Sequence, residues 1–146
     1  MPRRVIADII AGRPLITAGK GDTVRAGCRL MAQKKIGALL VVEGDKLAGI
    51  FTERDALNKV LAAGLDPDKT TLAQVMVSDL QTIRASKPLA YALHMMAEGG
   101  FRHVPVLDDD GRPVGMVSAR DALGADLVDL ERELKRQEAL ESSIGY

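Results

Sequence analysis

The nine residues GIFTERDAL at positions 49–57 decide the fold, because a second copy, GMVSARDAL, stands at positions 115–123. Glycine, arginine, aspartate, alanine and leucine occupy the same places in both copies, and Thr52 is matched by Ser118. Upstream of the copies, LLVV at 39–42 aligns with VPVL at 104–107, and Thr17 aligns with Thr82. A shared order of this length predicts a tandem duplication.

Each half is expected to contain a helix, two adjacent strands and the start of a further helix. The apolar runs at 38–42 and 47–52 flank a turn, as do those at 103–107 and 114–118, which is typical of strand pairs. Helices are predicted over 24–34, with Asp22 as N-cap, and over 89–98, with Ser86 as N-cap. A third helix is predicted to start at Thr52 and at Ser118.

The predicted fold class is α/β (α+β), with two repeated units that each hold a small sheet and flanking helices. Because each unit alone is too small to bury its strands, the two are expected to pack into one pseudo-two-fold module. The units are predicted at residues 5–63 and 71–123, with a linker at 64–70 and a helical tail at 124–146. An apolar stripe favours packing of that tail against its own domain or a second subunit; it consists of Leu123, Leu127, Leu130 and Leu134.

The composition argues against several classes of protein. Of 146 residues, 20 are Lys or Arg and 20 are Asp or Glu, so the net charge of zero argues against nucleic-acid binding. The sequence shows neither a signal-peptide pattern nor a run of about 18 apolar residues, which predicts a cytoplasmic protein without membrane contact. With one cysteine, Cys28, and no zinc-ligand spacing, no metal site is predicted. No local catalytic motif or GxxxxGK[ST] phosphate loop is present, so no enzymatic activity is predicted.

The motif Gly-x-x-Thr/Ser-x-x-Asp ends the second strand of each predicted pair. One interpretation is a capping box, in which the hydroxyl and the carboxylate satisfy the first N–H groups of a helix. The other is a nucleotide site: the glycine leaves room for a flat base, the carboxylate accepts hydrogen bonds from ribose hydroxyls, and hydroxyl and arginine face a phosphate. These residues are Gly49, Thr52, Arg54 and Asp55 in the first copy, and Gly115, Ser118, Arg120 and Asp121 in the second.

These motifs resemble those of a pair of CBS (cystathionine β-synthase) domains, an arrangement also called a Bateman module. The resemblance covers roughly residues 5–123 and rests on the two strand pairs, the two Gly-x-x-Thr/Ser-x-x-Asp motifs and the segment FRHVPV at 101–106. It implies a sensor that binds an adenosine-containing ligand in the cleft between the repeats. AMP is the first choice, and ADP, ATP, NAD and S-adenosylmethionine are the alternatives.

The resemblance also implies two unequal sites. A nucleotide whose ribose is held by Asp55 would face Arg102 and His103, whereas one held by Asp121 would face Gly37 and Ala38. We therefore expect the Asp55 site to favour anionic nucleotides more strongly, because a phosphate and a guanidinium about 4 Å apart attract each other by roughly 4 kcal/mol at an effective dielectric near 20. The expected adenine walls are Ile16, Ile36, Leu80 and Phe101, and Thr17 and Thr82 are expected either to line the pockets or to serve as strand residues.

The function predicted from the sequence is a non-catalytic regulatory module that binds an adenine nucleotide and acts on a separate protein. The alternative is a structural dimerisation module with empty or vestigial pockets. A homodimer is expected in either case. Its expected surfaces are the tail and two apolar helix faces, formed by Val24, Cys28 and Met31 and by Leu89, Leu93 and Met96.

Overall fold

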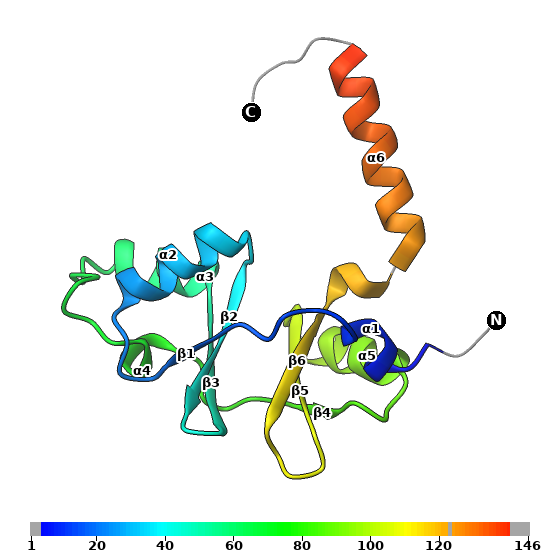
Figure 1. Cartoon of the computed structure of the whole chain (residues 1–146). Coiled ribbons are helices and arrows are strands. Elements are labelled where there is room, and N and C mark those ends of the chain that lie inside the picture. The colour runs from blue at the N-terminus through cyan, green and yellow to red at the C-terminus, as the bar shows by residue number, and fades with distance from the viewer. Residues whose placement is uncertain (1–3, 123, 141–146) are drawn as a thin grey trace.

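Two three-stranded sheets of the same topology form the body of the molecule (Figure 1). The computed structural model describes residues 4–122 and 124–140. The first sheet holds β1 (Thr17–Gly19), β2 (Ala38–Glu43) and β3 (Lys46–Thr52), and the second holds β4 (Ile83–Arg84), β5 (His103–Leu107) and β6 (Pro113–Ser118). In each sheet a parallel pair is followed by an antiparallel pair. The predicted duplication and fold class are therefore confirmed.

The register repeats as closely as the sequence does. In the first sheet Leu39 lies opposite Phe51, and in the second Val104 lies opposite Val117 at the corresponding positions. Both antiparallel pairs also shift register near the same place, at Val41/Val42 and at Val106/Leu107. The second turn is one residue longer, but the pairing of the strands before it is the same in both sheets. A one-residue slip would have moved every side chain of a strand to the opposite face.

One helix follows the first strand of each sheet, and the N-cap predicted for each is wrong. Helix α2 (Val24–Lys34) is capped by Thr23, whose hydroxyl accepts a hydrogen bond from the Ala26 N–H at 3.1 Å. The carboxylate of Asp22 instead accepts the Gly19 N–H at 2.9 Å, which closes the preceding turn. Helix α5 (Leu89–Gly99) follows Pro88 and has no side-chain cap.

A backbone group from a distant segment takes the place of the missing cap on α5. The Leu89 N–H donates to the carbonyl of Arg4 at 2.8 Å. Because this partner lies 85 positions earlier in the chain (89 minus 4), the local pattern around Ser86 gave no sign of it.

The helices that follow β3 and β6 begin as predicted but differ in winding. After Thr52, α3 (Glu53–Asp55) continues into a π-helical segment, η1 (Ala56–Leu61). After Ser118 the chain forms a 3₁₀ turn, η2 (Ala119–Ala122), which leads towards α6 (Gly124–Leu140).

Each half has its own apolar core, and α2 and α5 supply one side of it. Val24 and Met31 pack with Leu39 and Phe51 in the first core. Leu89 and Met96 pack with Val104, Val106 and Val117 in the second. The apolar helix faces expected to mediate dimerisation are therefore largely buried inside the chain. Four of their six residues are only 1–6% exposed, namely Val24, Met31, Leu89 and Met96.

The two halves meet through the other face of the first sheet. Ala38, Leu40 and Ile50 are buried there against Leu80 and Met116, the second of which comes from β6. Strands β2 and β3 are thus covered on both faces, as their continuous apolar runs suggest. This contact also sets the distance between the strand ends that carry the candidate site.

The first short helix of each half packs on the sheet of the other half. Helix α1 (Ile6–Ile10) lies against the second sheet, where Ile6 is fully buried in the second core. Helix α4 (Leu72–Val75) contributes Leu72 to the first core in the same way. The sequence assigns residues 5–10 to the first unit, but α1 lies beside α5 of the second half (Figure 1).

The exchange is symmetrical, because the two helices also bridge to equivalent positions. Val5 bridges to Pro88, and Thr71 bridges to Thr23. Positions 5 and 71, and positions 23 and 88, correspond in the alignment of the two halves. Each half therefore depends on the other for part of its core.

The predicted tail helix is present as α6, which leads away from the two sheets (Figure 1). Residues 132–140 are all exposed, and Leu134 is 57% exposed, so this part does not pack against its own domain. Leu123 lies outside the described residues, as do the side chains of Leu127 and Leu130. In the described part of the chain, no helix combines the length and apolar character needed to cross a bilayer.

Candidate functional site

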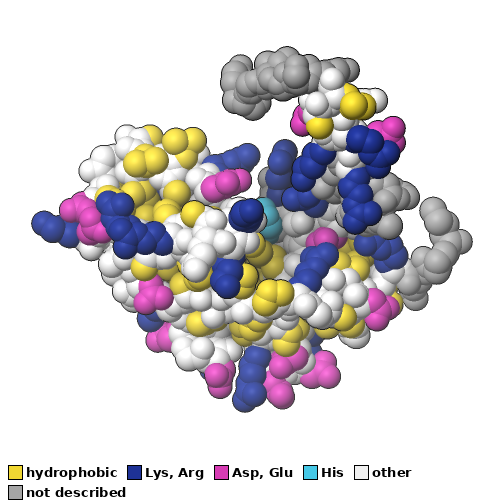
Figure 2. All heavy atoms as spheres, turned by 45° about the horizontal axis from the view of Figure 1, so that its top comes forward, with side chains coloured by type: hydrophobic (Ala, Val, Ile, Leu, Met, Phe, Trp, Pro, Cys, Tyr) yellow, Lys and Arg dark blue, Asp and Glu magenta, His cyan; other side chains and the backbone are white. Residues whose placement is uncertain are grey.

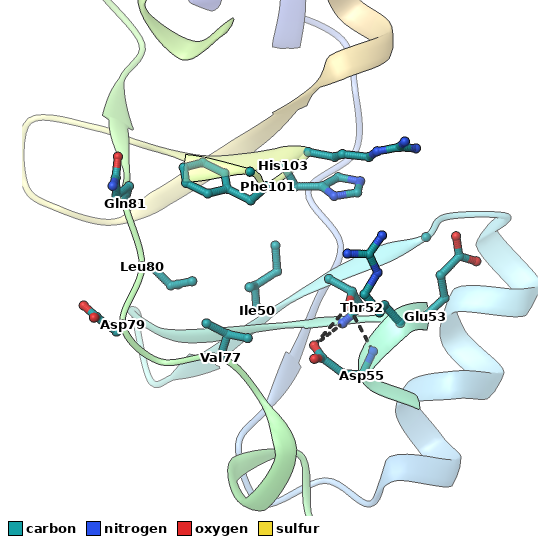
Figure 3. A pocket seen from close by; sticks show the side chains of 14 residues that line it. Ile50, Thr52, Glu53, Asp55, Val77, Asp79, Leu80, Gln81, Phe101 and His103 are labelled. Carbon is teal, nitrogen blue, oxygen red and sulfur yellow. Dashed lines mark hydrogen bonds between the residues drawn. The ribbon is translucent and has the colours of Figure 1, made fainter. Parts of the chain in front are cut away.

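A cavity of about 390 Å³ lies between the two halves, at the carboxyl end of β3 (Figure 3). Its apolar walls are formed by Ile50, Val77, Leu80 and Phe101. Segment 77–81, which follows the exchanged helix α4, lines one side, and the loop before β5 lines another. The cavity falls within the range of roughly 300–1,000 Å³ that is usual for small-molecule sites.

Asp55 lies at the edge of this cavity and forms a capping box with Thr52. The Asp55 carboxylate accepts hydrogen bonds from the Thr52 N–H and hydroxyl, both at 3.0 Å, and the Asp55 N–H donates to Thr52 Oγ1 at 3.2 Å. All the side-chain bonds to Thr52 use Oδ2. The remaining oxygen, Oδ1, lies 3.1 Å from Lys59 Nζ. The capping interpretation is therefore confirmed, and Oδ1 keeps lone pairs that a ligand hydroxyl can use.

The cavity combines charges of both signs from the two halves. Arg54 and Glu53 come from the first half, and Arg102 comes from the second. Asp79 adds a further carboxylate from the segment after α4. With Asp55, the described lining therefore carries three carboxylates and two guanidinium groups.

His103 stands where this cavity meets a second one. It lines both cavities, as does Gly37. Burial lowers the pKa of the His103 imidazole, and Arg102 lowers it further, although Glu53 and Asp121 act in the opposite direction. This shift favours the neutral form of the ring, which donates a hydrogen bond from one nitrogen and accepts one at the other.

The second cavity, of about 280 Å³, lies at the carboxyl end of β6. It is lined by Ile16, Ile36, Gly37 and Ala38 from the first half and by Ser118 and Arg120 from the second, all of which were singled out from the sequence. Arg13 and Lys35 also line it. Asp121, the residue expected to hold a ribose here, is not among its lining residues.

Asp121 is instead engaged by an arginine of its own chain. Arg13 Nη2 lies 2.7 Å from Asp121 Oδ1, and Arg13 Nη1 lies 3.2 Å from Oδ2. The Ser118 N–H donates to Oδ2 at 2.8 Å, and Arg4 Nη1 donates to the Asp121 carbonyl at 2.6 Å. Burial alone would raise the pKa of the Asp121 carboxyl, but the hydrogen bonds from Arg13 and Ser118 outweigh it and lower the pKa.

The two motif glycines make room for side chains and backbone of the exchanged segments. A Cβ on Gly49 would stand 2.6 Å from Met76 Sδ and 2.8 Å from the Val77 carbonyl oxygen. A Cβ on Gly115 would meet three atoms of Ile10 at 3.1 Å. Met76 and Ile10 stand at equivalent positions, at the ends of the exchanged helices. Gly49 lines neither cavity, so the structure does not support the expected approach of a flat base there, whereas Gly115 lines the second cavity and the expectation stays a prediction at that position.

The remaining sequence-predicted residues divide into two groups. Thr52, Arg54, Phe101, Arg102 and His103 all line the first cavity beside Asp55. Thr17, which pairs with Leu40 in the first sheet, and Thr82, which precedes β4, line neither of the two cavities.

Two residues of the site were not expected from the sequence. Arg13 reaches Asp121 across 108 positions, and no local motif marks such a pair. Asp79 follows α4 at the position that corresponds to Arg13, counted from Leu72 and Ile6. An alignment extended to these loops would have revealed this exchange of charge. Among the described residues, no group of three His, Cys, Asp or Glu side chains is placed to hold a metal ion.

Comparison with known proteins gives a consistent result for this architecture. The family model described as the CBS domain matches residues 6–62 and 72–128. A CBS domain-containing mitochondrial protein of Arabidopsis thaliana, CBSX3, is 36% identical over 123 residues, which are 81% of this chain. The match spans 59% of that plant protein's length.

Two solved structures show the same arrangement. A protein with CBS domains from Burkholderia ambifaria is 35% identical, with a TM-score of 0.73 over 87% of this chain and 93% of that one. The CBS domain pair of protein MJ0100, solved with 5′-methylthioadenosine and S-adenosyl-L-methionine, is 28% identical, with a TM-score of 0.72 over 81% of this chain and 95% of that one. The duplicated motif, the repeated topology and the family match agree, and the chain belongs to the CBS domain family as a tandem pair.

Proposed function

We propose that this protein is a regulatory module that binds an adenosine-containing ligand in the first cavity and catalyses no reaction. The observation that carries the proposal is the meeting of Asp55 and Thr52 from one half with Phe101, Arg102 and His103 from the other. The related pair MJ0100 was solved with two ligands that share an adenosine group, which supports the same ligand class here. AMP remains our first choice, with ADP, ATP, NAD and S-adenosylmethionine as alternatives.

The proposed contacts follow from the chemistry of the lining. The ribose hydroxyls donate to Asp55 Oδ1, which carries only the contact with Lys59. The adenine ring packs between Ile50, Val77 and Phe101. A phosphate is attracted by Arg54 and Arg102, although the three carboxylates of the lining reduce that attraction.

Binding at the junction of the halves offers a route to regulation. A ligand that contacts both β3 and the loop before β5 favours the conformation in which these segments fit it best, and so shifts the population of conformers. We propose that a separate protein recognises this change. Cytoplasmic location and a homodimeric state are part of the same proposal.

Calorimetric titration of the full chain with AMP, ADP, ATP, NAD and S-adenosylmethionine tests the proposal. We expect one of them to bind with micromolar affinity, roughly −7 to −8 kcal/mol. The Asp55→Ala variant should weaken that ligand by about 1.5–3 kcal/mol, because hydrogen bonds to a charged acceptor are lost. Asp109→Ala is the matched control, since the Asp109 side chain is 99% exposed and far along the chain from the motif. If none of the five compounds binds at millimolar concentration, the proposal is wrong.

The alternative function, a dimerisation module with vestigial pockets, has one observation in its favour. Leu57 and Leu61 of η1 are 58% and 71% exposed and stand one helical turn apart. Exposed apolar side chains that cluster on a helix are typical of interfaces. A dimeric mass by light scattering, together with no response to any adenosine ligand, would favour this alternative over the regulatory function.

A further inference from the structure

The Asp55 carboxylate has a cationic partner that stands behind the first cavity. Lys59 Nζ lies 3.1 Å from Asp55 Oδ1 and donates a hydrogen bond to the carbonyl of Val75 at 3.0 Å. Lys59 is not among the described residues that line the cavity. We therefore expect any effect of Lys59 on a ligand there to pass through Asp55.

An ion pair at the surface would be no evidence of such a role, because charged side chains of both signs gather over the face shown in Figure 2 and surface pairs contribute little. The Glu43 carboxylate, which pairs with Lys20, is 65% exposed. The Asp55 side chain is only 9% exposed. A buried carboxylate depends on its partners for the stabilisation that water gives an exposed one, so Lys59 matters more to Asp55 than a surface cation does.

Lys59 is itself held by the exchanged helix α4. Val75 is the last residue of α4, and its carbonyl belongs to the groups that a helix leaves without an internal partner at its carboxyl end. Segment 77–81, which follows α4, forms one wall of the cavity. Lys59 thus connects the motif carboxylate of the first half to the segment that closes the site.

The second half makes a corresponding connection from the opposite direction. Arg13, which follows the exchanged helix α1, bonds to both oxygens of Asp121. Position 125, which corresponds to Lys59 in the alignment of the two halves, is alanine. A cation therefore links the motif carboxylate to the exchanged segment in both halves, although the two cations stand at unrelated positions.

Thr52 and Lys59 hold the Asp55 carboxylate from two sides. The Thr52 N–H and hydroxyl bond to Oδ2, and Lys59 holds Oδ1 (Figure 3 shows the Thr52 bonds). Binding groups that are locked by neighbouring contacts lose less conformational freedom when a ligand arrives. We propose that Lys59 is a positioning residue that orients Asp55 for the ribose hydroxyls and so determines the preference of the site for ribose. This inference rests on the function proposed above.

Titrations with adenosine and with 2′,3′-dideoxyadenosine, which lacks both ribose hydroxyls, test the role of Lys59. Lys59→Met keeps an unbranched side chain and removes the charge. We expect this variant to bind adenosine about tenfold more weakly, and to bind dideoxyadenosine as the wild-type chain does. Titration followed by NMR suits both ligands, because it also measures weak binding. A merely structural role of Lys59 would weaken both ligands equally, and that result overturns the proposal.

The matched control is Lys20→Met, because Lys20 is 46% exposed, close to the 43% of Lys59, and pairs with Glu43. It should change neither affinity. Lys59→Arg keeps a cation that can donate to both partners and should restore most of the adenosine affinity. An unchanged or higher adenosine affinity in Lys59→Met also overturns the proposal, since Lys59 would then compete with the ligand for Oδ1. If melting shows that Lys59→Met does not fold, Lys59→Gln takes its place.

The wild-type titrations keep this inference separate from the proposed function. If adenosine binds to the wild-type chain and Lys59→Met changes the two affinities alike, only the role of Lys59 is refuted. If adenosine does not bind to the wild-type chain, the proposed function and this inference both fail.

Discussion

The two halves of the molecule share their topology but differ in the cation that pairs with the motif carboxylate. Seven positions after Leu72 stands Asp79, which lines the first cavity, while the Asp55 carboxylate pairs with Lys59, 3.1 Å away. Seven positions after Ile6 stands Arg13, which holds both oxygens of Asp121. The duplication thus yields one carboxylate that lines a cavity and pairs with a lysine through a single oxygen, and one that an arginine holds at both oxygens. The motif alone does not define a site; the segment from the other half decides whether it is open.

The largest effect is expected from substitutions that disrupt the exchange of short helices between the halves. Ile6 and Leu72 are both fully buried, each in the core of the opposite half. Ile6→Ala and Leu72→Ala should each lower the free energy of unfolding by about 2–5 kcal/mol, because a cavity is left in a packed core. Urea denaturation measures both.

Leu15→Ala is the control for this pair, because Leu15 is 46% exposed. Equal losses in the two core variants are expected from the symmetry of the exchange. A loss below about 1 kcal/mol for Ile6→Ala would mean that α1 is not part of the second core.

The second-largest effect is expected when an arginine equivalent to Arg13 is introduced into the first cavity. Asp79→Arg places a guanidinium group in the lining of the first cavity, at the position equivalent to Arg13, and should weaken binding of the adenosine ligand there about tenfold or more. Asp79→Asn removes the charge without adding a cation and should change the affinity much less. Calorimetry with the ligand that the wild-type chain binds best provides the measurement. Equal affinity of the arginine and wild-type chains would disprove the equivalence of positions 13 and 79.

The sequence predicted the parts of the fold that local patterns determine. The strands β2, β3, β5 and β6 and the helices α2 and α5 lie within one or two residues of their predicted bounds, because apolar periodicity sets them. The duplicated motif also indicated the correct family. The capping box at Thr52 and Asp55 was an alternative that the spacing alone could raise.

The errors arise where a distant segment supplies the partner. Ser86 was expected to cap α5, whereas the carbonyl of Arg4 accepts the Leu89 N–H. Gly49 was expected to face a base, whereas Met76 and the Val77 carbonyl lie against it. The pair of Arg13 and Asp121 has the same origin. In each case the exchanged helices bring the partner, and no pattern within one half encodes that exchange.

A third effect compares the two glycines under the exchanged helices. Gly49→Ala would bring a Cβ within 2.8 Å of a backbone oxygen, which cannot rotate away, so we expect a loss of about 1–3 kcal/mol in unfolding free energy. Gly115→Ala meets only Ile10 side-chain atoms, at 3.1 Å, and should cost less because that side chain can shift. Urea denaturation of the two variants gives the comparison. A greater loss at Gly115 than at Gly49 would contradict it.

The smallest effect concerns the pH dependence that Arg13 gives to the second half. The pKa of Asp121 is held below its usual value of 3.8, so its carboxylate stabilises the fold above that pH. As the pH falls from 3.8 towards the lower pKa of the folded state, the unfolded chain takes up the proton first and the contribution is lost. The Arg13 side chain is 48% exposed, so solvent screening limits the contribution to about 1 kcal/mol. We therefore expect Asp121→Asn to be less stable than the wild-type chain at neutral pH by about this amount, and the difference to shrink in acid.

Denaturant unfolding at a series of pH values measures this difference in stability. The control is Asp109→Asn, at a side chain that is 99% exposed, and it should show no such difference. A difference between Asp121→Asn and the wild-type chain that stays constant or grows below pH 3.8 would show that Asp121 is not stabilised through its charge.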